Sequence, residues 1–244
     1  MRIAVVGHGK TGHEVEAVLG ERGHEAVVVP RGAAYPSDCA VGIDFTQADA
    51  VIANVAAAVA AGSRYVVGTT GWSEHIDEVA SAVRRAGSGL VHAANFSLGV
   101  NLFYRIVQQA AGLLSGFSDY DPFVLERHHR QKKDAPSGTA KDLAAIVEGA
   151  KGPRLRGVTS FAGAIPPDAF HVASVRAGGI VGDHTVGFDS GGDEILLEHR
   201  ARSRRGFATG AVLAAEWIAT RTGVHTFDAV LDDLLKRTSP PPAP

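Results

Sequence analysis

The chain has 244 residues, of which 45% are hydrophobic and 20% charged, and its formal net charge is −2 at pH 7. Such a chain can bury a sizeable core as one large domain or two small ones, and disorder as its main state is excluded. The charge gives no broad positive field for nucleic acid or an anionic membrane, and no apolar stretch approaches a membrane span. The single Cys39 offers no intramolecular disulfide or cysteine-pair zinc site, which favours the cytoplasm.

The first predicted element is a buried parallel strand at 3–6, which leads into Gly7-His8-Gly9-Lys10-Thr11-Gly12 and then a helix at 13–22. This G-x-G-x-x-G spacing is typical of a dinucleotide-binding turn, whose glycines let the backbone approach a pyrophosphate at the positive helix end. A plain strand-to-helix turn is the alternative. A nucleoside-triphosphate P-loop is excluded because it needs glycine where this chain has Ala4.

Further strands are predicted at 25–29, 41–45, 65–67 and 89–92, with an alanine-rich helix at 48–61. This alternation predicts an α/β fold with a Rossmann-type doubly wound parallel sheet. Ligands bind beyond the carboxyl ends of such strands. We therefore expect one crevice lined by Asp44-Phe45-Thr46, Gly68-Thr69-Thr70-Gly71 and Ala93-Ala94-Asn95-Phe96. For Asp44 and Thr46, plain loop positions are an equal alternative.

The end of the second strand bears on the choice of cofactor. An NAD-selective site usually has an acidic residue there, whereas a nearby arginine accommodates the extra phosphate of NADP. This chain has Pro30 and Arg31. We expect NADPH to be accepted at least as well as NADH, with Arg31 as a solvated loop charge being the alternative.

A basic cluster, HHRQKKDAPSGTA, occupies residues 128–140 after a predicted strand at 123–126. His128 and His129 are expected to point to opposite sides of an extended chain. Pro136-Ser137-Gly138-Thr139 opens a predicted helix whose free N–H groups suit a carboxylate or phosphate, with Lys132 and Lys133 nearby. A histidine is suited to donate a proton near neutral pH. The cluster thus predicts anion binding and acid catalysis together.

These residues belong to a longer signature, Glu126-x-His128-His129-Arg130-x-Lys132-x-Asp134-Ala135-Pro136-Ser137-Gly138-Thr139-Ala140. It resembles the signature of the 4-hydroxy-tetrahydrodipicolinate reductase family, long called dihydrodipicolinate reductases. Other segments resemble the family's motifs in the same order, namely the glycine turn, Asp44-Phe45-Thr46, Gly68 to Gly71, Ala94-Asn95-Phe96-Ser97-x-Gly99-Val100-Asn101, Ser174 to Val186 and His199-Arg200-Ala201.

The resemblance implies reduction of a cyclic, unsaturated dicarboxylic acid by NADPH or NADH, with loss of water, in lysine and diaminopimelate biosynthesis. It implies His128 as the proton donor and Lys132 as the second catalytic group. The implied substrate-binding residues are His129, Lys132, Ser137, Gly138, Thr139 and Thr70. The implied cofactor residues are Gly7, His8, Gly9, Lys10, Thr11, Gly12, Gly68, Thr69, Thr70, Ala93, Ala94, Asn95 and Phe96, to which our own interpretation adds Arg31.

The rest of the chain predicts a second α+β domain with a largely antiparallel sheet. Strands at 170–176, 180–189 and 194–201 are joined by glycine-rich connections, which suggests a meander. A helix is predicted around 207–218, which in the family returns to the nucleotide domain. We assign 1–96 with 208–244 to dinucleotide binding, and 97–207 to substrate binding and oligomerisation. The resemblance implies a homotetramer built on this second sheet.

Two further interpretations concern histidines and metals. His184 and His199 fall in predicted strands, where a hydrogen-bonded structural histidine is the more common case. His128 and His129 lack an evident third ligand, so no metal is expected.

Two other functions stay open. A related dehydrogenase acting on a different dicarboxylate would share the glycine turn, but it has no reason for the basic cluster. A non-catalytic NAD(P)-sensing protein would keep the cofactor residues and lose the proton donor, whereas His128 and Lys132 are both present.

Overall fold

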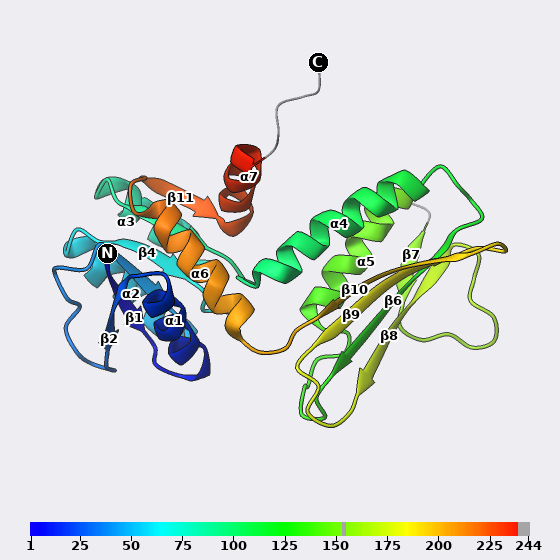
Figure 1. Cartoon of the computed structure of the whole chain (residues 1–244), viewed down its shortest axis with the longest axis horizontal. Coiled ribbons are helices and arrows are strands. Elements are labelled where there is room, and N and C mark those ends of the chain that lie inside the picture. Colours follow the sequence, from blue (N-terminus) through cyan, green and yellow to red (C-terminus); the bar gives the residue numbers. More distant parts are fainter. Residues whose placement is uncertain (153–154, 239–244) are drawn as a thin grey trace, which may run out of the picture. The chain divides into compact units, whose positions relative to one another are not determined.

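The computed structural model describes residues 1–152 and 155–238, and the chain divides into two compact units (Figure 1). The first unit consists of Met1–Leu98 and Arg204–Pro244, and the second of Gly99–Ser203. Residues 239–244 of the first unit lie outside the described part. The binding roles expected for 1–96 with 208–244 and for 97–207 stay predictions.

The first unit contains a parallel sheet of six strands in the order β11-β5-β4-β3-β1-β2. The strands are β1 (Arg2–Val6), β2 (Glu25–Val29), β3 (Val41–Asp44), β4 (Arg64–Val67), β5 (Gly89–His92) and β11 (Gly223–Thr226). The chain runs outward from β1 to β2 and then crosses to β3 on the other side of β1. The topological switch point therefore lies between β1 and β3, where ligands of doubly wound sheets bind.

Helices cover both faces of this sheet. The first face is covered by α1 (Lys10–Glu21), α6 (Arg205–Ile218) and α7 (Phe227–Thr238), and the second by α2 (Val51–Ala60) and α3 (Ile76–Arg85), with 3₁₀ turns η1 (Ala48–Ala50) and η2 (Ser73–His75). Alternate residues of β1 serve the two cores, since Ile3 and Val5 pack with α1 and α6 whereas Ala4 and Val6 pack with α2 and α3. Burial on both faces explains the continuous apolar strands.

Helix α6 lies very close to the chain that leaves β5. A Cβ atom built on Gly210 would lie 1.9 Å from the carbonyl oxygen of Phe96, so only glycine permits this approach. The helix is otherwise rich in buried alanines, which keep its backbone near the sheet. The helix predicted around 207–218 is thus confirmed.

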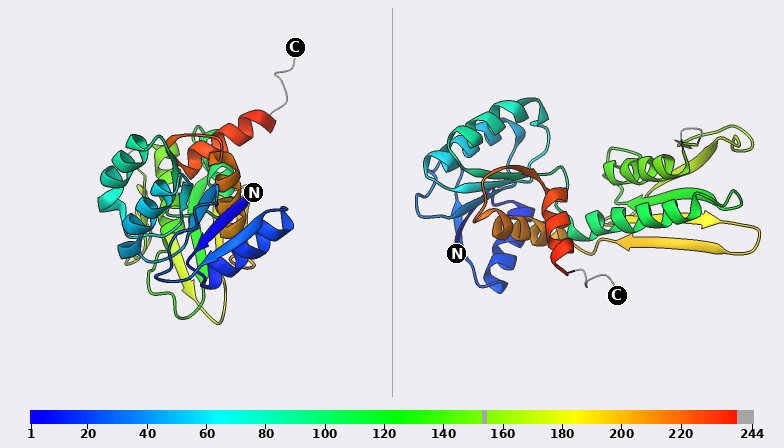
Figure 2. Two further views of the ribbon diagram at one scale, coloured as in Figure 1. Left: turned by 90° about the vertical axis from the view of Figure 1, so that its left-hand side faces the viewer. Right: turned by 90° about the horizontal axis from the view of Figure 1, so that it is seen from above.

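The second unit contains a mixed sheet in the order β10-β9-β6-β8-β7. Its strands are β6 (Asp121–His128), β7 (Arg156–Val158), β8 (Ala169–Arg176), β9 (Asp183–Asp189) and β10 (Glu194–Arg200). Helices α4 (Leu98–Leu114) and α5 (Gly138–Lys151) pack on one face of it (Figure 2). The apolar face predicted for α5, Ala140, Leu143, Ala144 and Val147, is buried as expected. The Rossmann-type sheet and the second α+β part are therefore both confirmed. The second sheet is mixed rather than largely antiparallel, because β6, β8 and β7 pair in parallel.

The expected meander is wrong at one connection. Strands β9 and β10 form an antiparallel hairpin. However, β8 and β9 are not neighbours, because β6 lies between them, parallel to β8 and antiparallel to β9. The glycine-rich segment at 177–179 therefore crosses over β6 rather than closing a hairpin.

None of the described helices is long and apolar enough to cross a lipid bilayer.

Candidate active site

The glycine turn lies at the switch point of the first sheet. Gly7 has a φ of +91°, and a Cβ atom there would lie 2.6 Å from the carbonyl oxygen of Phe45 after β3. A Cβ atom on Gly12 would lie 2.1 Å from the carbonyl oxygen of Gly7. These two glycines are required by packing within the chain.

Gly9 differs from its neighbours because nothing in the chain lies within 4 Å of the position of its Cβ atom. It is the N-cap of α1, and no side chain caps this helix. First-turn N–H groups at such a helix start suit an anion. The space left by Gly9 and the uncapped helix start fit the pyrophosphate of a dinucleotide.

A buried carboxylate organises the next loops along the sheet edge. Asp44 is fully buried at the end of β3. Its oxygens accept hydrogen bonds from the Thr46 amide and hydroxyl, the Thr69 hydroxyl, the Asn54 amide and the Tyr65 hydroxyl. Asp44 is therefore neither a ligand-facing group nor a plain loop residue. It holds Thr46 and Thr69, and thereby fixes the loops after β3 and β4.

The other predicted cofactor residues lie at the start of α1 and in the loops after β1, β2, β4 and β5, at the carboxyl ends of the strands. Thr70 and Ala94 are exposed, and so is Arg31. Phe96 is buried, with its ring centroid 6.4 Å from that of Phe45 and 4.9 Å from that of Phe227. The structure thus brings the cofactor residues together in the first unit, with Phe96 packed into its core.

In the second unit, the end of β6 carries a buried carboxylate. Glu126 is completely buried, and its Oε1 atom accepts hydrogen bonds from the Arg176 guanidinium (2.6 Å), the Ser174 hydroxyl (2.7 Å) and the Ser137 amide (3.1 Å). Burial raises the pKa of Glu126, but these hydrogen bonds outweigh it and lower the pKa to about 2. Glu126 is therefore ionised throughout the neutral range.

His128 follows two residues later on the same face of β6. Its Nδ1 atom lies 2.5 Å from Oε2 of Glu126, and only 7% of the residue is exposed. Burial lowers the pKa of His128, while the Glu126 carboxylate raises it and Lys132 and Arg176 lower it. A Cβ atom on Gly182 would lie 2.9 Å from Nε2 of His128, so the glycine leaves room for the ring.

His184 faces the same cluster from β9. It is paired with Glu126 across the sheet, and its ring centroid lies 5.2 Å from that of His128. Its Nε2 atom lies 3.3 Å from the Ser137 hydroxyl. Burial, followed by the nearby His128, lowers the pKa of His184 to about 4. His184 is thus neutral near pH 7 and packs against the side of the cluster.

The predicted anion site at the start of α5 is smaller than expected. Ser137 is the N-cap, and its hydroxyl accepts a hydrogen bond from the Ala140 amide. The Ser137 amide donates to Glu126 and is not free, contrary to the prediction. This leaves Gly138 and Thr139 as the first-turn amides that can meet a ligand.

The basic side chains of the cluster are partly committed. The Lys132 ammonium donates to Asp134 Oδ1 at 2.8 Å, and the Arg176 guanidinium also donates to the Asp134 carbonyl oxygen. His129 is half-buried, unlike its buried neighbour His128. The two adjacent histidines therefore have different environments, as the extended chain predicts.

The structure also changes the view of possible metal ligands. Glu126, His128 and His184 each bring one ligand atom within 4.8 Å of the others, and an exposed group of His8, His13 and Glu16 does the same on the glycine turn and α1. A third potential ligand near His128 therefore exists, which the sequence did not reveal. The expectation of no metal stays a prediction.

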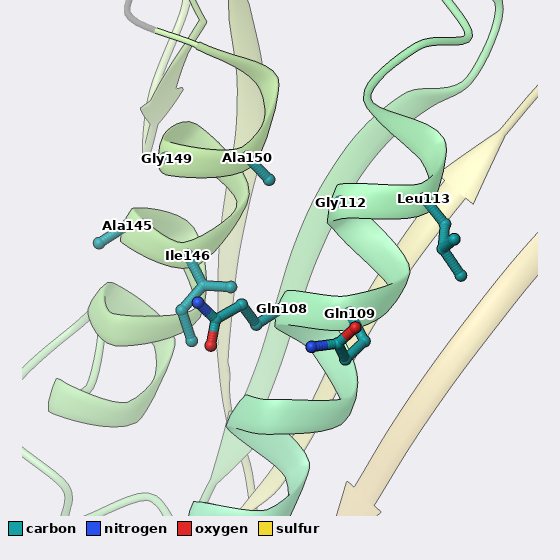
Figure 3. Close-up of a pocket in the computed structure, with 8 residues that line it drawn as sticks. All are labelled: Gln108, Gln109, Gly112, Leu113, Ala145, Ile146, Gly149 and Ala150. Atoms are coloured by element: carbon teal, nitrogen blue, oxygen red, sulfur yellow. The ribbon is translucent and has the colours of Figure 1, made fainter. Parts of the chain in front are cut away.

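The groove between α4 and α5 does not contain the predicted site residues. It has a volume of about 610 Å³ and is lined by Gln108, Gln109, Gly112, Leu113, Ala145, Ile146, Gly149 and Ala150 (Figure 3). Its surface offers two carboxamides and otherwise small or aliphatic groups, with no titratable side chain. It therefore lacks the proton donor and the cations that a dicarboxylate reaction needs.

Three residues of the site were not predicted from the sequence, namely Glu126, Arg176 and His184. One signal was available for Glu126, because β6 alternates strictly in burial and places Glu126 on the buried face with His128. Arg176 and His184 join them only through the pairing of β6 with β8 and β9.

The fold and the site define the class of the protein. A doubly wound parallel sheet with a glycine turn at its switch point, carried together with a unit that holds a buried histidine and cations, is typical of a nicotinamide-dependent oxidoreductase that acts on acidic substrates.

Comparisons with known proteins identify the family. The family model described as dihydrodipicolinate reductase, N-terminus, matches residues 27–96, and the model of its C-terminus matches residues 99–231. The chain belongs to the dihydrodipicolinate reductase family, whose members are NAD(P)H-dependent oxidoreductases of lysine and diaminopimelate biosynthesis. This outcome confirms the resemblance read from the sequence.

Individual relatives agree with this assignment. The 4-hydroxy-tetrahydrodipicolinate reductase of Christiangramia forsetii is 35% identical over 242 residues, which cover 97% of this chain and 100% of the relative. That of Methanococcoides burtonii is 43% identical over 192 residues, which cover 78% and 72%. A dipicolinate-bound dihydrodipicolinate reductase from Paenisporosarcina sp. TG-14 has the same fold, with a TM-score of 0.73 at 21% identity, covering 94% of this chain and 98% of that one.

The buried histidines predict that acid destabilises the protein early. Burial lowers the pKa of His92, His128, His184 and His199. Each therefore binds a proton more weakly when folded than when unfolded, so its contribution to stability is complete above about pH 6.5 and is lost as the pH falls. For His184 the loss extends to about pH 4.

We expect the free energy of unfolding in urea to fall between pH 7 and pH 5, before the carboxylates titrate. The buried His184 alone contributes a slope of at most about 1.4 kcal/mol per pH unit. His184→Gln should show a shallower slope than the parent chain. A free energy of unfolding that stays constant from pH 7 to pH 5 would contradict the prediction.

Proposed function

We propose that the chain reduces 4-hydroxy-tetrahydrodipicolinate to tetrahydrodipicolinate with loss of water, with His128 as the proton donor. The observation that carries this proposal is the buried Glu126–His128 pair with cations around it. Its placement in the family's signature supports the same role. NADPH or NADH, when bound, supplies the hydride.

The glycine turn holds the cofactor in this proposal. First-turn amides of α1 bind the pyrophosphate, and Gly9 leaves space for its approach. Gly68, Thr69 and Thr70, together with the loop from Ala93 to Phe96, hold the nicotinamide end. Asp44 keeps Thr69 in place and so preserves the loop before any ligand binds.

His128 supplies the proton at the reacting ring. Hydride addition pushes negative charge onto a neighbouring ring atom, which a general acid must protonate. Burial makes the His128 imidazolium a stronger acid than a solvated histidine, because it lowers the pKa. The ring gives up the proton from Nε2 and is left neutral, with Nδ1 next to Glu126.

Two carboxylates of the substrate require two anion sites. The amides of Gly138 and Thr139 at the start of α5 form one of them. Lys132 and His129 provide charge and hydrogen-bond donors for the second, and Lys132 is also proposed as the second catalytic group. Substrate binding would then compete with Asp134 for the Lys132 ammonium.

We further propose that the protein works as a homotetramer in the cytoplasm. Val175 of β8 and Leu196 of β10 are large apolar side chains on the sheet face away from α4 and α5, and they are 42% and 53% exposed in the single chain. Burial of such side chains against another copy is favourable. The one cysteine, Cys39, is free and buried, which agrees with a reducing compartment.

The reaction is tested by mixing the chain with freshly generated 4-hydroxy-tetrahydrodipicolinate and following the oxidation of NADPH or NADH by its absorbance. We expect oxidation of the cofactor that depends on both substrate and protein. Tight binding of a cofactor without any turnover would contradict the proposal and favour an NAD(P)-sensing protein.

Arg31 is expected to favour NADPH. Its side chain is exposed after β2, where the extra phosphate of NADP is placed in this fold. We expect Arg31→Ala to raise the KM for NADPH roughly 10-fold, the effect of losing one charge-assisted contact, and to leave the KM for NADH unchanged.

Arg84→Ala is the matched control for Arg31, because Arg84 is an equally exposed arginine on α3. It should leave both KM values as they are. If Arg31→Ala changed the KM for NADPH and the KM for NADH equally, Arg31 would be a solvated loop charge instead.

A further inference from the structure

We propose that Glu126 is a positioning residue for His128, which fixes the orientation and the tautomer of the imidazole from which the proton is transferred. This inference rests on the proposed role of His128 as proton donor. It gives Glu126 a part in the reaction although its carboxylate is completely buried.

The Glu126 carboxylate cannot rotate freely. Oε1 of Glu126 accepts hydrogen bonds from three different elements: Arg176 and Ser174 on β8, and the amide of Ser137 before α5. Arg176 is itself held by the carbonyl oxygen of Asp134. With one oxygen tied in this way, the place of the other oxygen is determined.

The other oxygen of Glu126 contacts His128. Oε2 of Glu126 and Nδ1 of His128 are 2.5 Å apart. Neither atom has a hydrogen-bond partner in the described ranges 1–152 and 155–238, so no hydrogen bond there competes with this ion pair. A carboxylate at this distance favours a proton on Nδ1.

The opposite side of the His128 ring carries Nε2. With the proton of the neutral ring on Nδ1, Nε2 is the atom that gains and loses the transferred proton. Gly182 makes room for this edge, since a Cβ atom there would lie 2.9 Å from Nε2. Glu126 thus orients the ring by its charge at Nδ1, and Gly182, which has no side chain, leaves room for the Nε2 edge.

Glu126 opposes the effect that two nearby cations have on the pKa of His128. Burial is the largest effect that lowers the pKa of His128, Lys132 and Arg176 lower it further, and His184 lies against the ring. Among these groups, only Glu126 raises the pKa of His128. Without its charge, the protonated form needed for the reaction would be present over a narrower range of pH.

Glu126→Gln tests the proposal because glutamine keeps the size of the side chain and removes its charge. Its amide can also donate to Nδ1, which would move the ring proton to Nε2. We expect kcat to fall about 100-fold, the size of effect that misplacing a reacting group produces. The KM for the dicarboxylate should change little, and the descending limb of kcat against pH should move to lower pH.

Nitrogen NMR of the imidazole provides a readout that does not depend on turnover. In the full-length parent chain, the His128 signals, assigned by their loss in His128→Gln, should show the Nδ1–H tautomer at neutral pH. Glu126→Gln should shift them towards the Nε2–H tautomer. Glu126→Asp keeps the charge and should restore the Nδ1–H tautomer together with part of the lost kcat.

Glu216→Gln is the matched control. Like Glu126, Glu216 on α6 is bonded to an arginine and a histidine, here Arg22 and His24, but it is only half-buried and lies in the first unit. Its loss should lower stability and leave the pH profile unchanged.

Two results would overturn the proposal. The first is an Nε2–H tautomer of His128 in the parent chain. This measurement does not depend on whether Glu126→Gln folds. The second is an unchanged pH limb in Glu126→Gln accompanied only by lower stability. Full activity of His128→Gln would instead overturn the proposed proton donor, so the two failures are distinguishable.

Discussion

His128→Gln is expected to lower kcat by roughly 10²- to 10³-fold, because a positioned general acid contributes about this much to a proton transfer. Glutamine fills a similar volume and can accept or donate hydrogen bonds, but it has no acidic proton to give. The KM for the cofactor should stay as it is, since the glycine turn belongs to the other unit. Steady-state rates at saturating dicarboxylate and NADPH measure the effect.

The dependence of kcat/KM on pH gives a second test of His128 as the proton donor. The donor must be protonated, so kcat/KM should decrease as the pH rises through the pKa of His128, which burial places below its ordinary value. This limb should be missing from the residual activity of His128→Gln. The control is His171→Gln, a half-buried histidine of β8 whose ring packs on Phe161 and not in the site. A similar loss in both variants would contradict a specific role for His128.

Gly12→Ala is expected to damage the fold and the cofactor site together. The new methyl group would lie 2.1 Å from the carbonyl oxygen of Gly7, so the turn between β1 and α1 must open. We expect a loss of about 3 kcal/mol of stability, at the upper end for one added methyl group in a packed site. The affinity for NADPH should fall by roughly 100-fold, equivalent to ~3 kcal/mol. Urea unfolding and fluorescence titration measure the two effects.

Gly9→Ala separates the two effects, since its methyl group would meet nothing in the chain. Alanine is a poorer N-cap than glycine, so a loss of stability below about 1 kcal/mol is expected. The affinity for NADPH should nevertheless fall, because the methyl group takes the space assigned to the pyrophosphate. Unchanged NADPH affinity in Gly9→Ala would remove the cofactor from this helix start.

The first sheet could be predicted closely because its information is local. Strands buried on both faces are short apolar runs, and the strand at 89–92 was predicted with its observed bounds, Gly89–His92. The start of α5 was equally readable, since Ser137 is a strong N-cap followed by a regular apolar stripe. By contrast, α4 was not predicted, although Val100, Phe103, Val107 and Ala111 have the spacing of a buried helix face.

The second sheet and its site could not be derived in the same way. Pairing of β6 with β8 joins residues about 48 positions apart, for example Glu126 with Ser174, and no local pattern encodes such a pairing. For the same reason the sequence could not show what surrounds His184. It is a buried, hydrogen-bonded histidine, as expected, and the register of β6 and β9 places it against Glu126 and His128. The family signature predicts which residues carry the chemistry, and the strand register shows which residues surround them.

The discontinuous first unit has a consequence for how the protein is made. During translation, β1 to β5 leave the ribosome well before α6, α7 and β11, with the whole second unit synthesised in between. Until α6, β11 and α7 are made, the sheet face that α6 and α7 cover is open, and β5 is an edge strand without its neighbour β11. The second unit, Gly99–Ser203, by contrast contains its own core. Nascent chains of this protein therefore expose an apolar sheet face and an open strand edge for the time needed to add about a hundred residues. In such an interval the domains of growing chains fold or require chaperones.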